Sequence, residues 1–327
     1  MFSLQRKAQK TSAQRPLSFA VNMGEALNMA KIYDIAFLGH YTKDTIVSVE
    51  GSRVVDGGAF NYGSHAAVRM GLKVAAITRL AREDFNVVDE LKALGVDVFA
   101  RATPRSTCLR LEYPTSNVDE RILWITSSAE PFTVSEVKDI SSKAFVIGAS
   151  VRGEVPLDVI EELRKKKTLI AIDLQGFIRG VEKGRFVFQS WPEKEKILAA
   201  VDVVKGDAVE AELLTGQRDI RTAAKLIAGF GPKEVVLTHR EGVLVYDGNH
   251  FYEATFHPQK LVGRSGRGDT CIASYAARRL DAPASEATIW AAAVTSLKME
   301  AEGPFRRDIR AVEDLIRKKY SGIHSSP

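Results

Sequence analysis

Short apolar runs alternate with amphipathic segments along the chain from Ile32 onward. Six apolar runs predict buried strands, over residues 32–38, 74–78, 144–147, 169–173, 201–204 and 234–238. The segments between them have helical periodicity, and several end at a glycine. They predict helices from just after Gly58 to residue 70 and over 83–94, 157–166, 208–214 and 222–230, with another before the strand at 201 and three more at the end. This alternation predicts an α/β fold, in which helices pack on both faces of a mostly parallel sheet. Residues 243–246 and 250–254 are predicted as antiparallel strands at one edge.

Two stretches interrupt this alternation and predict a small β lid. Residues 45–55 alternate in polarity around a turn at 50–52, and the strand-like runs 107–113 and 121–126 flank a polar turn at 115–119. We therefore expect one large domain over residues 31–320, with lid segments near 44–57 and 105–127.

The two ends of the chain have a different composition. Residues 1–30 are polar and basic, and they contain no apolar run long enough for a secretory signal or a membrane helix. We expect a disordered leader there, with an organelle-targeting peptide as the alternative, and a short tail over 321–327.

Composition and charge exclude several classes of protein. An apolar content of 45% and a charged content of 27% are typical of a globular protein. The net charge is +5, but the first 31 residues carry five basic side chains against one acidic one, so the rest is nearly neutral. A nucleic-acid partner is therefore not expected. Cys108 and Cys271 form no Cys-x-x-Cys pair, which argues against a disulfide framework or a zinc site and favours a cytoplasmic location.

The most informative motif is a glycine-rich turn followed by a helical run. Gly263, Gly266 and Gly268 are closely spaced, and Asp269 follows them directly. Such a turn lets backbone N–H groups converge at a helix N-terminus, which suits an anion. A carboxylate beside a phosphate-binding turn suggests a base for phosphoryl transfer. The alternative is a flexible loop in which Asp269 is only the helix N-cap.

With a second motif, this turn resembles the ribokinase-type (phosphofructokinase-B) carbohydrate kinases. The N-terminal signature of that family is a Gly-Gly pair that opens a helix, and here it runs from Gly57 to Gly71. The C-terminal signature, Gly-Ala-Gly-Asp before a helix, appears as Gly266 to Asp269. The resemblance extends from about residue 32 to 319. It implies a ribokinase-like three-layer fold with a β lid, and ATP and Mg²⁺ as cofactors.

The resemblance implies roles at the C-terminal signature. Asp269 would be the catalytic base, and the N–H groups around Gly266, Arg267 and Gly268 would form the anion hole. Arg264 and Arg267 replace residues that are usually small or polar in the family. Either side chain would add a cation near phosphate, or else lie on the solvated surface.

The acceptor side is expected in the first part of the chain. Family members hold substrate hydroxyls with an Asp just past the first strand, and Asp44 occupies that position; its alternative role is a plain hairpin residue. The further substrate-binding predictions are Gly57, Gly58, Asn61 and Gln175. The usual Asn position falls on Tyr62. This departure resembles the branch that contains myo-inositol kinases and some archaeal-type nucleoside kinases, as do Gly39–His40, residues 173–179 and residues 303–305.

The donor side is expected in the second half of the chain. Lys205 is predicted to bind the nucleotide cofactor. It precedes Asp207 and Glu210, whose i, i+3 spacing puts two carboxylates on one helix face, where they would position Mg²⁺. A solvated helix start is the alternative. The predicted nucleotide-binding residues, which follow a strand as the nucleotide loop of the family does, are Thr238, Arg240 and Gly242. The Asp-x-Thr with which many relatives bind potassium is replaced by Gly263, Arg264 and Ser265, so potassium activation is not expected.

Motifs of competing classes are missing. The sequence has no Gly-Lys step of a Walker loop, and Arg267 stands where a nucleophile elbow needs its second glycine. No Gly-x-Gly-x-x-Gly follows the first strand. We therefore expect an ATP- and Mg²⁺-dependent kinase that phosphorylates a small sugar or a cyclitol such as myo-inositol, as a monomer or homodimer. A nucleoside kinase of the same family and a non-catalytic sugar- or nucleotide-binding protein are the alternatives.

Overall fold

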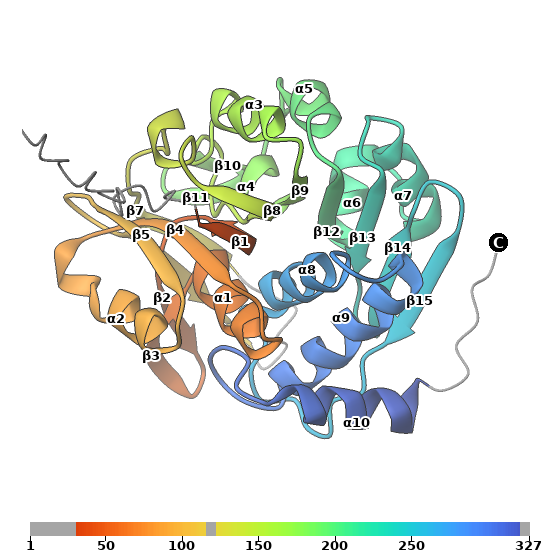
Figure 1. The fold of residues 1–327 in the computed structure, drawn as a ribbon. Coiled ribbons are helices and arrows are strands. Elements are labelled where there is room, and N and C mark those ends of the chain that lie inside the picture. Colours follow the sequence, from red (N-terminus) through yellow and green to blue (C-terminus); the bar gives the residue numbers. More distant parts are fainter. Residues whose placement is uncertain (1–30, 116–121, 321–327) are drawn as a thin grey trace, which may run out of the picture. The chain divides into compact units, whose positions relative to one another are not determined.

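The computed structural model describes residues 31–115 and 122–320, and a nine-stranded sheet lies at the centre of this part of the chain (Figure 1). In order across the sheet, its strands are β15 (Phe251–Thr255), β14 (Gly242–Tyr246), β13 (Glu234–Thr238), β12 (Val203–Asp207), β9 (Leu169–Asp173), β8 (Ser141–Ile147), β1 (Ile32–Leu38), β4 (Val74–Leu80) and β5 (Asp97–Ala102). The strands from β13 to β5 pair in parallel, and β14 and β15 are antiparallel at one edge. The predicted mostly parallel sheet is confirmed.

The central strands are apolar on both faces because helices cover both. Ile35 and Phe37 pack into one hydrophobic core, whereas Ala36 and Leu38 pack into the other. All four residues are fully buried. The period of two along the strand therefore divides the chain into two cores, one on each side of the sheet.

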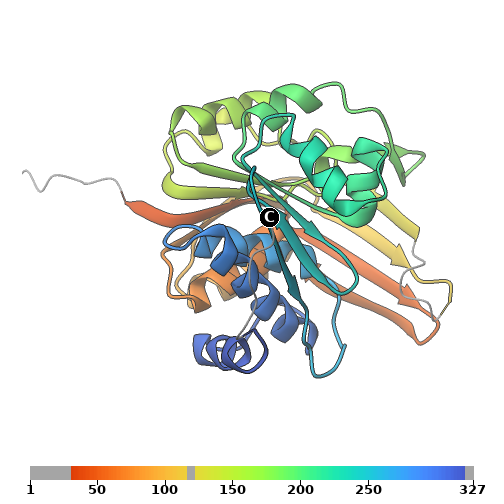
Figure 2. The same cartoon turned by 90° about the vertical axis from the view of Figure 1, so that its right-hand side faces the viewer.

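The helices form the two outer layers (Figure 2). They are α1 (Ala59–Arg69), α2 (Asn86–Ala93), α3 (Leu157–Lys165), α4 (Gln175–Ile178), α5 (Lys194–Ala199), α6 (Ala208–Thr215), α7 (Ile220–Ala228), α8 (Arg267–Arg278), α9 (Ala284–Met299) and α10 (Ile309–Lys319), with 3₁₀ turns η1 (Arg82–Asp84) and η2 (Val134–Glu136). Helices α1, α2, α8 and α9 share one core, and α3, α5, α6 and α7 share the other. None of the helices in the described residues is long and apolar enough to span a bilayer.

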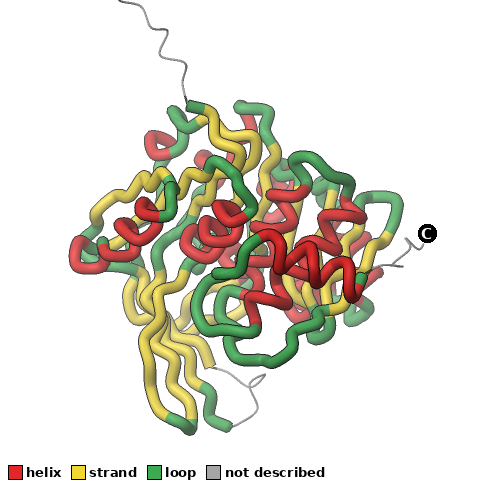
Figure 3. The backbone as a smooth tube through the Cα atoms, turned by 60° about the horizontal axis from the view of Figure 1, so that its bottom comes forward, coloured by secondary structure: helices red, strands yellow, loops and turns green. Residues whose placement is uncertain are grey.

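A second sheet projects beside the first (Figure 3). Its six strands, in order, are β10 (Arg179–Glu182), β11 (Arg185–Phe188), β7 (Ile122–Ser127), β6 (Thr107–Glu112), β2 (Thr42–Ser48) and β3 (Gly51–Gly57). Strands β2 and β6 pair in parallel and join the two predicted hairpins. The predicted lid is thus a single sheet, larger than two separate hairpins.

Some elements differ from the prediction. The hairpin β10–β11 was not predicted, because its strands are only four residues long and lack a clear period. Strand β5 was also missed, since its residues are half-buried or exposed at the edge of the central sheet and its sequence is partly charged. The helix predicted over 83–94 is divided into η1 and α2. The leader 1–30, the tail 321–327 and the lid turn at 116–121 lie outside the described residues.

Candidate active site

The predicted site residues gather where the parallel strands of the central sheet end. Strands β1, β8, β9 and β12 run in the same direction. Strands β9 and β12 end at Asp173 and Asp207, and β1 and β8 lead directly into Gly39 and Gly148. In open α/β sheets, this edge is the usual place for a ligand.

Asp269 lies in the first turn of helix α8, on the third residue of the helix. The N-cap is Gly266, with a left-handed φ of 73°, and no side chain caps the helix. Asp269 is therefore not the N-cap, and the predicted N-cap alternative is wrong. Tyr62 packs under the turn, because a Cβ atom at Gly266 would overlap the Tyr62 ring. Only glycine fits this left-handed position.

The surroundings of Asp269 increase its proton affinity. Burial is the main cause that raises its pKa, to about 6, and the carboxylate of Asp173 raises it further. Lys205 and Arg179 oppose this shift. Part of the residue nevertheless stays accessible to solvent, so a ligand can reach it. The result is a carboxylate that is ionised at neutral pH and has a raised affinity for a proton, as a general base requires.

Asp44 projects from strand β2 of the lid sheet and has an oxygen without a partner. Its Oδ1 is shielded from solvent and has no hydrogen-bond partner among residues 31–115 and 122–320. Burial raises the pKa of Asp44 to about 7; a hydrogen bond from Thr42 lowers it, and the Asp269 carboxylate raises it. A Cβ atom at Gly57 would lie 2.7 Å from Asp44 Oδ2, so glycine keeps this carboxylate open. Buried polar atoms are normally paired, and this oxygen suits a ligand hydroxyl.

Asn61 and Gly58 lie next to Asp44 at the start of α1. The Asn61 Nδ2 donates to the carbonyl of Asp56 at 3.2 Å, while its Oδ1 is buried without a partner in the described part of the chain. Gly58 has a φ of 95°, and a Cβ atom there would overlap the carbonyl oxygen of His40. The four predicted acceptor residues of the first part of the chain are therefore neighbours.

Gly148 connects this acceptor region with the predicted base. A Cβ atom at Gly148 would overlap the Ala59 side chain and would lie 3.9 Å from Asp269 Oδ1. The start of α1 and the Asp269 carboxylate thus both lie close to this glycine. Gln175, the remaining acceptor prediction, begins α4, and its backbone N–H donates to Asp173 Oδ1 at 3.1 Å.

Lys205 lies against the first turn of α8. A Cβ atom at Gly268 would lie 2.5 Å from Lys205 Nζ, and that Nζ donates to Asp173 Oδ2 at 2.8 Å. The side chain of Lys205 is buried. Burial opposes the charged form, but Asp173 and Glu210 outweigh it and raise the pKa of Lys205. A permanent cation therefore sits beside the predicted anion hole.

Asp207 and Glu210 form a capping box at the start of α6. Asp207 Oδ1 accepts from the Glu210 N–H at 2.8 Å, and Glu210 Oε2 accepts from the Asp207 N–H at 2.9 Å. Arg179 Nη2 lies 3.6 Å from Glu210 Oε1, and burial raises the pKa of Glu210 to about 7. Within the described ranges, no group of three or more His, Cys, Asp or Glu residues encloses a metal position. These two carboxylates would therefore hold Mg²⁺ only together with water and donor phosphates, which is how proteins usually bind this ion.

The predicted nucleotide residues lie at the ends of β13 and β14. Thr238 Oγ1 donates to the carbonyl of Gly206 at 3.4 Å, and Arg240 is exposed in the turn. A Cβ atom at Gly242 would overlap the carbonyl oxygen of Ala254, so strand pairing already requires this glycine. Arg264 is half-buried before α8. Contacts of these residues with a nucleotide stay predictions.

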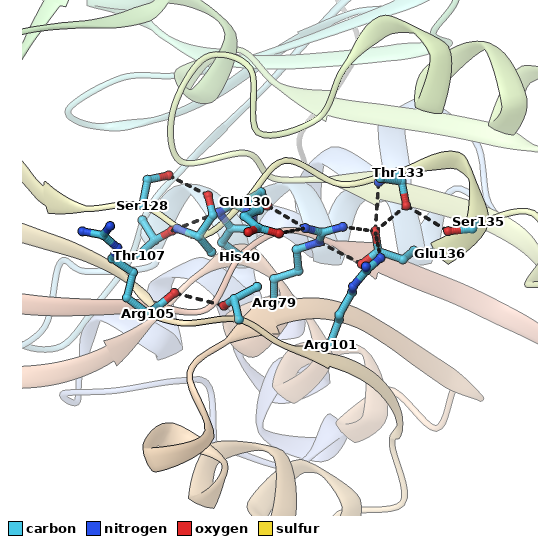
Figure 4. Close-up of polar contacts among 12 residues, drawn as sticks. His40, Arg79, Arg101, Arg105, Thr107, Ser128, Glu130, Thr133, Ser135 and Glu136 are labelled. Carbon is cyan, nitrogen blue, oxygen red and sulfur yellow. Dashed lines mark hydrogen bonds and ion pairs between the residues drawn. The ribbon is translucent and has the colours of Figure 1, made fainter.

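A polar cluster packs beside the connection between β1 of the central sheet and β2 of the second sheet (Figure 4). His40 follows β1, and its Nδ1 lies 2.9 Å from Thr107 Oγ1 at the start of β6. Burial lowers the pKa of His40, so the ring is neutral. Arg79 is also buried; its Nε donates to Glu136 Oε1 at 2.9 Å, and its Nη1 donates to the carbonyl of Glu130 at 3.2 Å. The cluster holds in place the strand that carries Asp44.

Sequence reasoning did not identify Lys298, which reaches the loop before α8. It is 2% exposed, and its Nζ donates to the carbonyl oxygens of Gly263, at 3.0 Å, and Ser265. The available signal was a lysine near the end of an otherwise apolar, alanine-rich helix. Arg179 lies within residues 173–179, which the sequence analysis singled out, but its pairing with Glu210 depends on the fold.

Comparisons with known proteins agree with this geometry. A sequence model of the pfkB family carbohydrate kinases matches residues 24–306. A cytidine kinase of Thermococcus kodakarensis is 27% identical over 256 residues, which cover 75% of this chain and 87% of the relative. A solved pyrophosphate-dependent kinase of the ribokinase family, in complex with a pyrophosphate analog and myo-inositol, is 38% identical with a TM-score of 0.79, over 86% of this chain and 99% of that chain.

A more distant structure shows the fold alone. The ribokinase of Arabidopsis thaliana, complexed with ribose and ATP, is 16% identical with a TM-score of 0.70, over 88% of this chain and 99% of that chain. The predicted ribokinase-like fold and the predicted enzyme class, a phosphotransferase with an alcohol group as acceptor, are confirmed. The family match extends over most of the chain, and this protein therefore belongs to the pfkB family of carbohydrate kinases.

Proposed function

We propose that this kinase phosphorylates a hydroxyl of a cyclitol, with myo-inositol as the first candidate, and that Asp269 accepts the hydroxyl proton. The observation that carries the proposal is the pair of carboxylates close to the start of α1. Asp44 has a buried oxygen without a partner, and Asp269 has a raised pKa at the N-terminus of a helix. The 38% identity to a structure that contains myo-inositol supports the choice of acceptor.

The residues divide the work between acceptor and donor. Asp44 and Asn61 accept hydrogen bonds from substrate hydroxyls and so orient the acceptor. Asp269 takes the proton from the attacking hydroxyl. The Arg267 N–H already donates to the carbonyl of Arg264 at 3.1 Å, so the transferred phosphoryl oxygens are held at the Gly268 N–H and by the positive end of the α8 dipole. Mg²⁺, bound near Asp207 and Glu210, would neutralise charge on the donor phosphates.

The two candidate phosphoryl donors are ATP and pyrophosphate. ATP is the donor that the family resemblance implies, and Thr238, Arg240 and Gly242 are the residues proposed to contact it. Pyrophosphate is the second candidate, because the structure at 38% identity is described as pyrophosphate-dependent. The buried Lys205 ammonium against Gly268 also suits a compact, highly charged donor.

Two alternatives to a cyclitol kinase are a nucleoside kinase and a non-catalytic binding protein. The cytidine kinase relative supports a nucleoside, at 27% identity. A non-catalytic binding protein would need no base, whereas Asp269 remains with its glycines at the start of α8.

A panel of acceptors and donors tests the proposal. Purified enzyme is incubated with myo-inositol, ribose, fructose and cytidine, each with ATP or pyrophosphate and Mg²⁺, and the phosphate ester is identified by ³¹P NMR. We expect turnover of myo-inositol with one of the two donors and its loss in Asp269→Asn. Asp281→Asn is the matched control, because Asp281 is exposed just beyond the same helix. Turnover of cytidine alone contradicts the cyclitol proposal, and no turnover with any pair contradicts catalysis.

Location and assembly also stay proposals. A cytoplasmic location is supported by Cys108 and Cys271, which are both free thiols. Monomer and homodimer remain the two proposed states, and sedimentation separates them.

A further inference from the structure

Lys298 is a buried ammonium on the loop that leads into the anion hole. It lies in the last turn of α9, and its Nζ donates to the backbone carbonyls of Gly263, at 3.0 Å, and Ser265. Taking an ammonium out of water is costly unless its hydrogen bonds are satisfied. The two carbonyls satisfy it in part, and together they form a cation-binding arrangement of backbone oxygens.

The two carbonyls determine how the next peptide groups are oriented. In a planar trans peptide, the C=O of one residue and the N–H of the next point in opposite directions. When Lys298 holds the Ser265 carbonyl, the N–H of Gly266 must point away from the ammonium. Gly266 is the N-cap of α8, the helix that carries Asp269. The ammonium therefore fixes the peptide plane at the entrance to the anion hole.

Other contacts enclose the ammonium from further sides. The N–H groups of Val262 and Gly263 donate to the carbonyl of Met299, at 2.9 Å and 3.1 Å, so the loop is tied to the end of α9. Lys298 Nζ also lies 5.6 Å from the centre of the Tyr62 ring, which packs under Gly266. The ammonium thus joins α9, the loop and α1 at one point.

We propose that Lys298 is a positioning residue whose ammonium acts as a built-in monovalent cation and holds residues 263–266 in the anion-binding conformation. The inference rests on the proposed phosphoryl transfer. It adds that no external monovalent ion is needed, because the side chain already occupies the position between the carbonyls of Gly263 and Ser265.

Chemical rescue tests this role. Lys298→Ala removes the ammonium and leaves room for a small cation between the two carbonyls. We expect kcat/KM to fall about 10- to 100-fold, which is less than the roughly 10²- to 10³-fold cost of removing an anion-hole donor, because the donors themselves remain. We also expect 100 mM potassium or ammonium ions, and not tetramethylammonium, to restore at least about tenfold of that loss, since only small ions fit between carbonyl oxygens. The wild-type enzyme should respond equally to all three salts.

A matched control separates this effect from the loss of any lysine. Lys194 Nζ lies 4.4 Å from the centre of the Phe230 ring, outside the site. Lys194→Ala should keep wild-type activity and show no dependence on potassium. If Lys298→Ala keeps wild-type kcat/KM, or folds but loses activity that neither potassium nor ammonium restores, the proposal is overturned.

A binding readout makes the test independent of turnover. Calorimetric titration with inorganic pyrophosphate and with a non-hydrolysable ATP analogue should show donor binding at least tenfold weaker in Lys298→Ala, with acceptor affinity unchanged. Equal losses for donor and acceptor would overturn the positioning role.

If the Ala variant does not fold, Lys298→Met keeps most of the apolar stem. This variant must show the same selective loss of donor binding, and donor binding at the wild-type level would overturn the proposal. A wild-type enzyme that turns over no acceptor refutes the proposed function instead.

Discussion

The Nζ of Lys205 lies 2.8 Å from Oδ2 of Asp173, and this buried pair joins the ends of the adjacent strands β12 and β9. Its other neighbour is the first turn of α8, where a Cβ atom at Gly268 would come within 2.5 Å of the ammonium. The pair therefore has two roles. It links two strands, and it places a positive charge where donor phosphates are expected.

These two roles separate in a double-mutant comparison. Lys205→Met leaves the buried Asp173 carboxylate unpaired, which should destabilise the protein by about 3–5 kcal/mol. Lys205→Met combined with Asp173→Asn removes both charges, so most of that stability should return. Donor affinity should stay low in both variants. Thermal unfolding and donor titration measure the two effects, and a wild-type donor affinity in the double variant would place Lys205 outside the donor site.

Asp269→Asn removes the base without changing the size of the side chain. We expect kcat to fall by roughly 10² to 10⁴ while the protein remains folded, because a general base contributes about that factor. Circular dichroism checks the fold, and Asp281→Asn controls for the loss of an acidic side chain nearby. A kcat close to that of the wild type would remove Asp269 from its role.

The sequence predicted the architecture because its signals are local. The apolar runs of β1, β9 and β13 and the glycines that end the first helices are readable without knowledge of contacts. The lid was predicted from two hairpin patterns, but the parallel pairing of β2 with β6 joins segments far apart in the chain. Neither segment alone contains a sequence pattern that predicts this pairing.

The sequence predicted those site residues that belong to, or lie near, a recognisable family motif. Asp44, Gly57, Gly58 and Asn61 come together as neighbours around the start of α1. Lys298 was missed because its partners are backbone carbonyls, which any residue supplies. The capping box of Asp207 and Glu210 depends on helix geometry, and the metal role of the two carboxylates stays a prediction.

Asp44→Asn tests the acceptor side. The substitution keeps the shape of the side chain but removes the charge that accepts substrate hydroxyls, and hydrogen bonds to a charged group are worth about 1.5–3 kcal/mol. We therefore expect the acceptor KM to rise about 10- to 100-fold, with the donor KM within about twofold of the wild type. Glu112→Gln, on the neighbouring strand of the same sheet, is the control. A parallel rise in both KM values would make Asp44 structural.

The pH dependence of activity and stability should run in opposite directions between pH 5 and 7. The pKa values of Asp44 and Asp269 are raised to about 7 and about 6, mainly by burial, and each carboxylate must be ionised to act. Activity should therefore fall as the pH drops below about 7. The fall should become steeper below about 6, where the second carboxylate also protonates.

Protonation of the same two carboxylates should increase the free energy of unfolding while it decreases activity. A carboxyl group with a folded pKa above its unfolded value binds protons more tightly in the folded state, so lowering the pH from 7 towards 5 should stabilise the fold. Urea unfolding across this range should show that gain, and Asp44→Asn and Asp269→Asn should each reduce it. Activity that stays constant down to pH 5 would show that neither carboxylate is perturbed as its burial implies, and the assignment of the base would then have to rest on the α8 geometry alone.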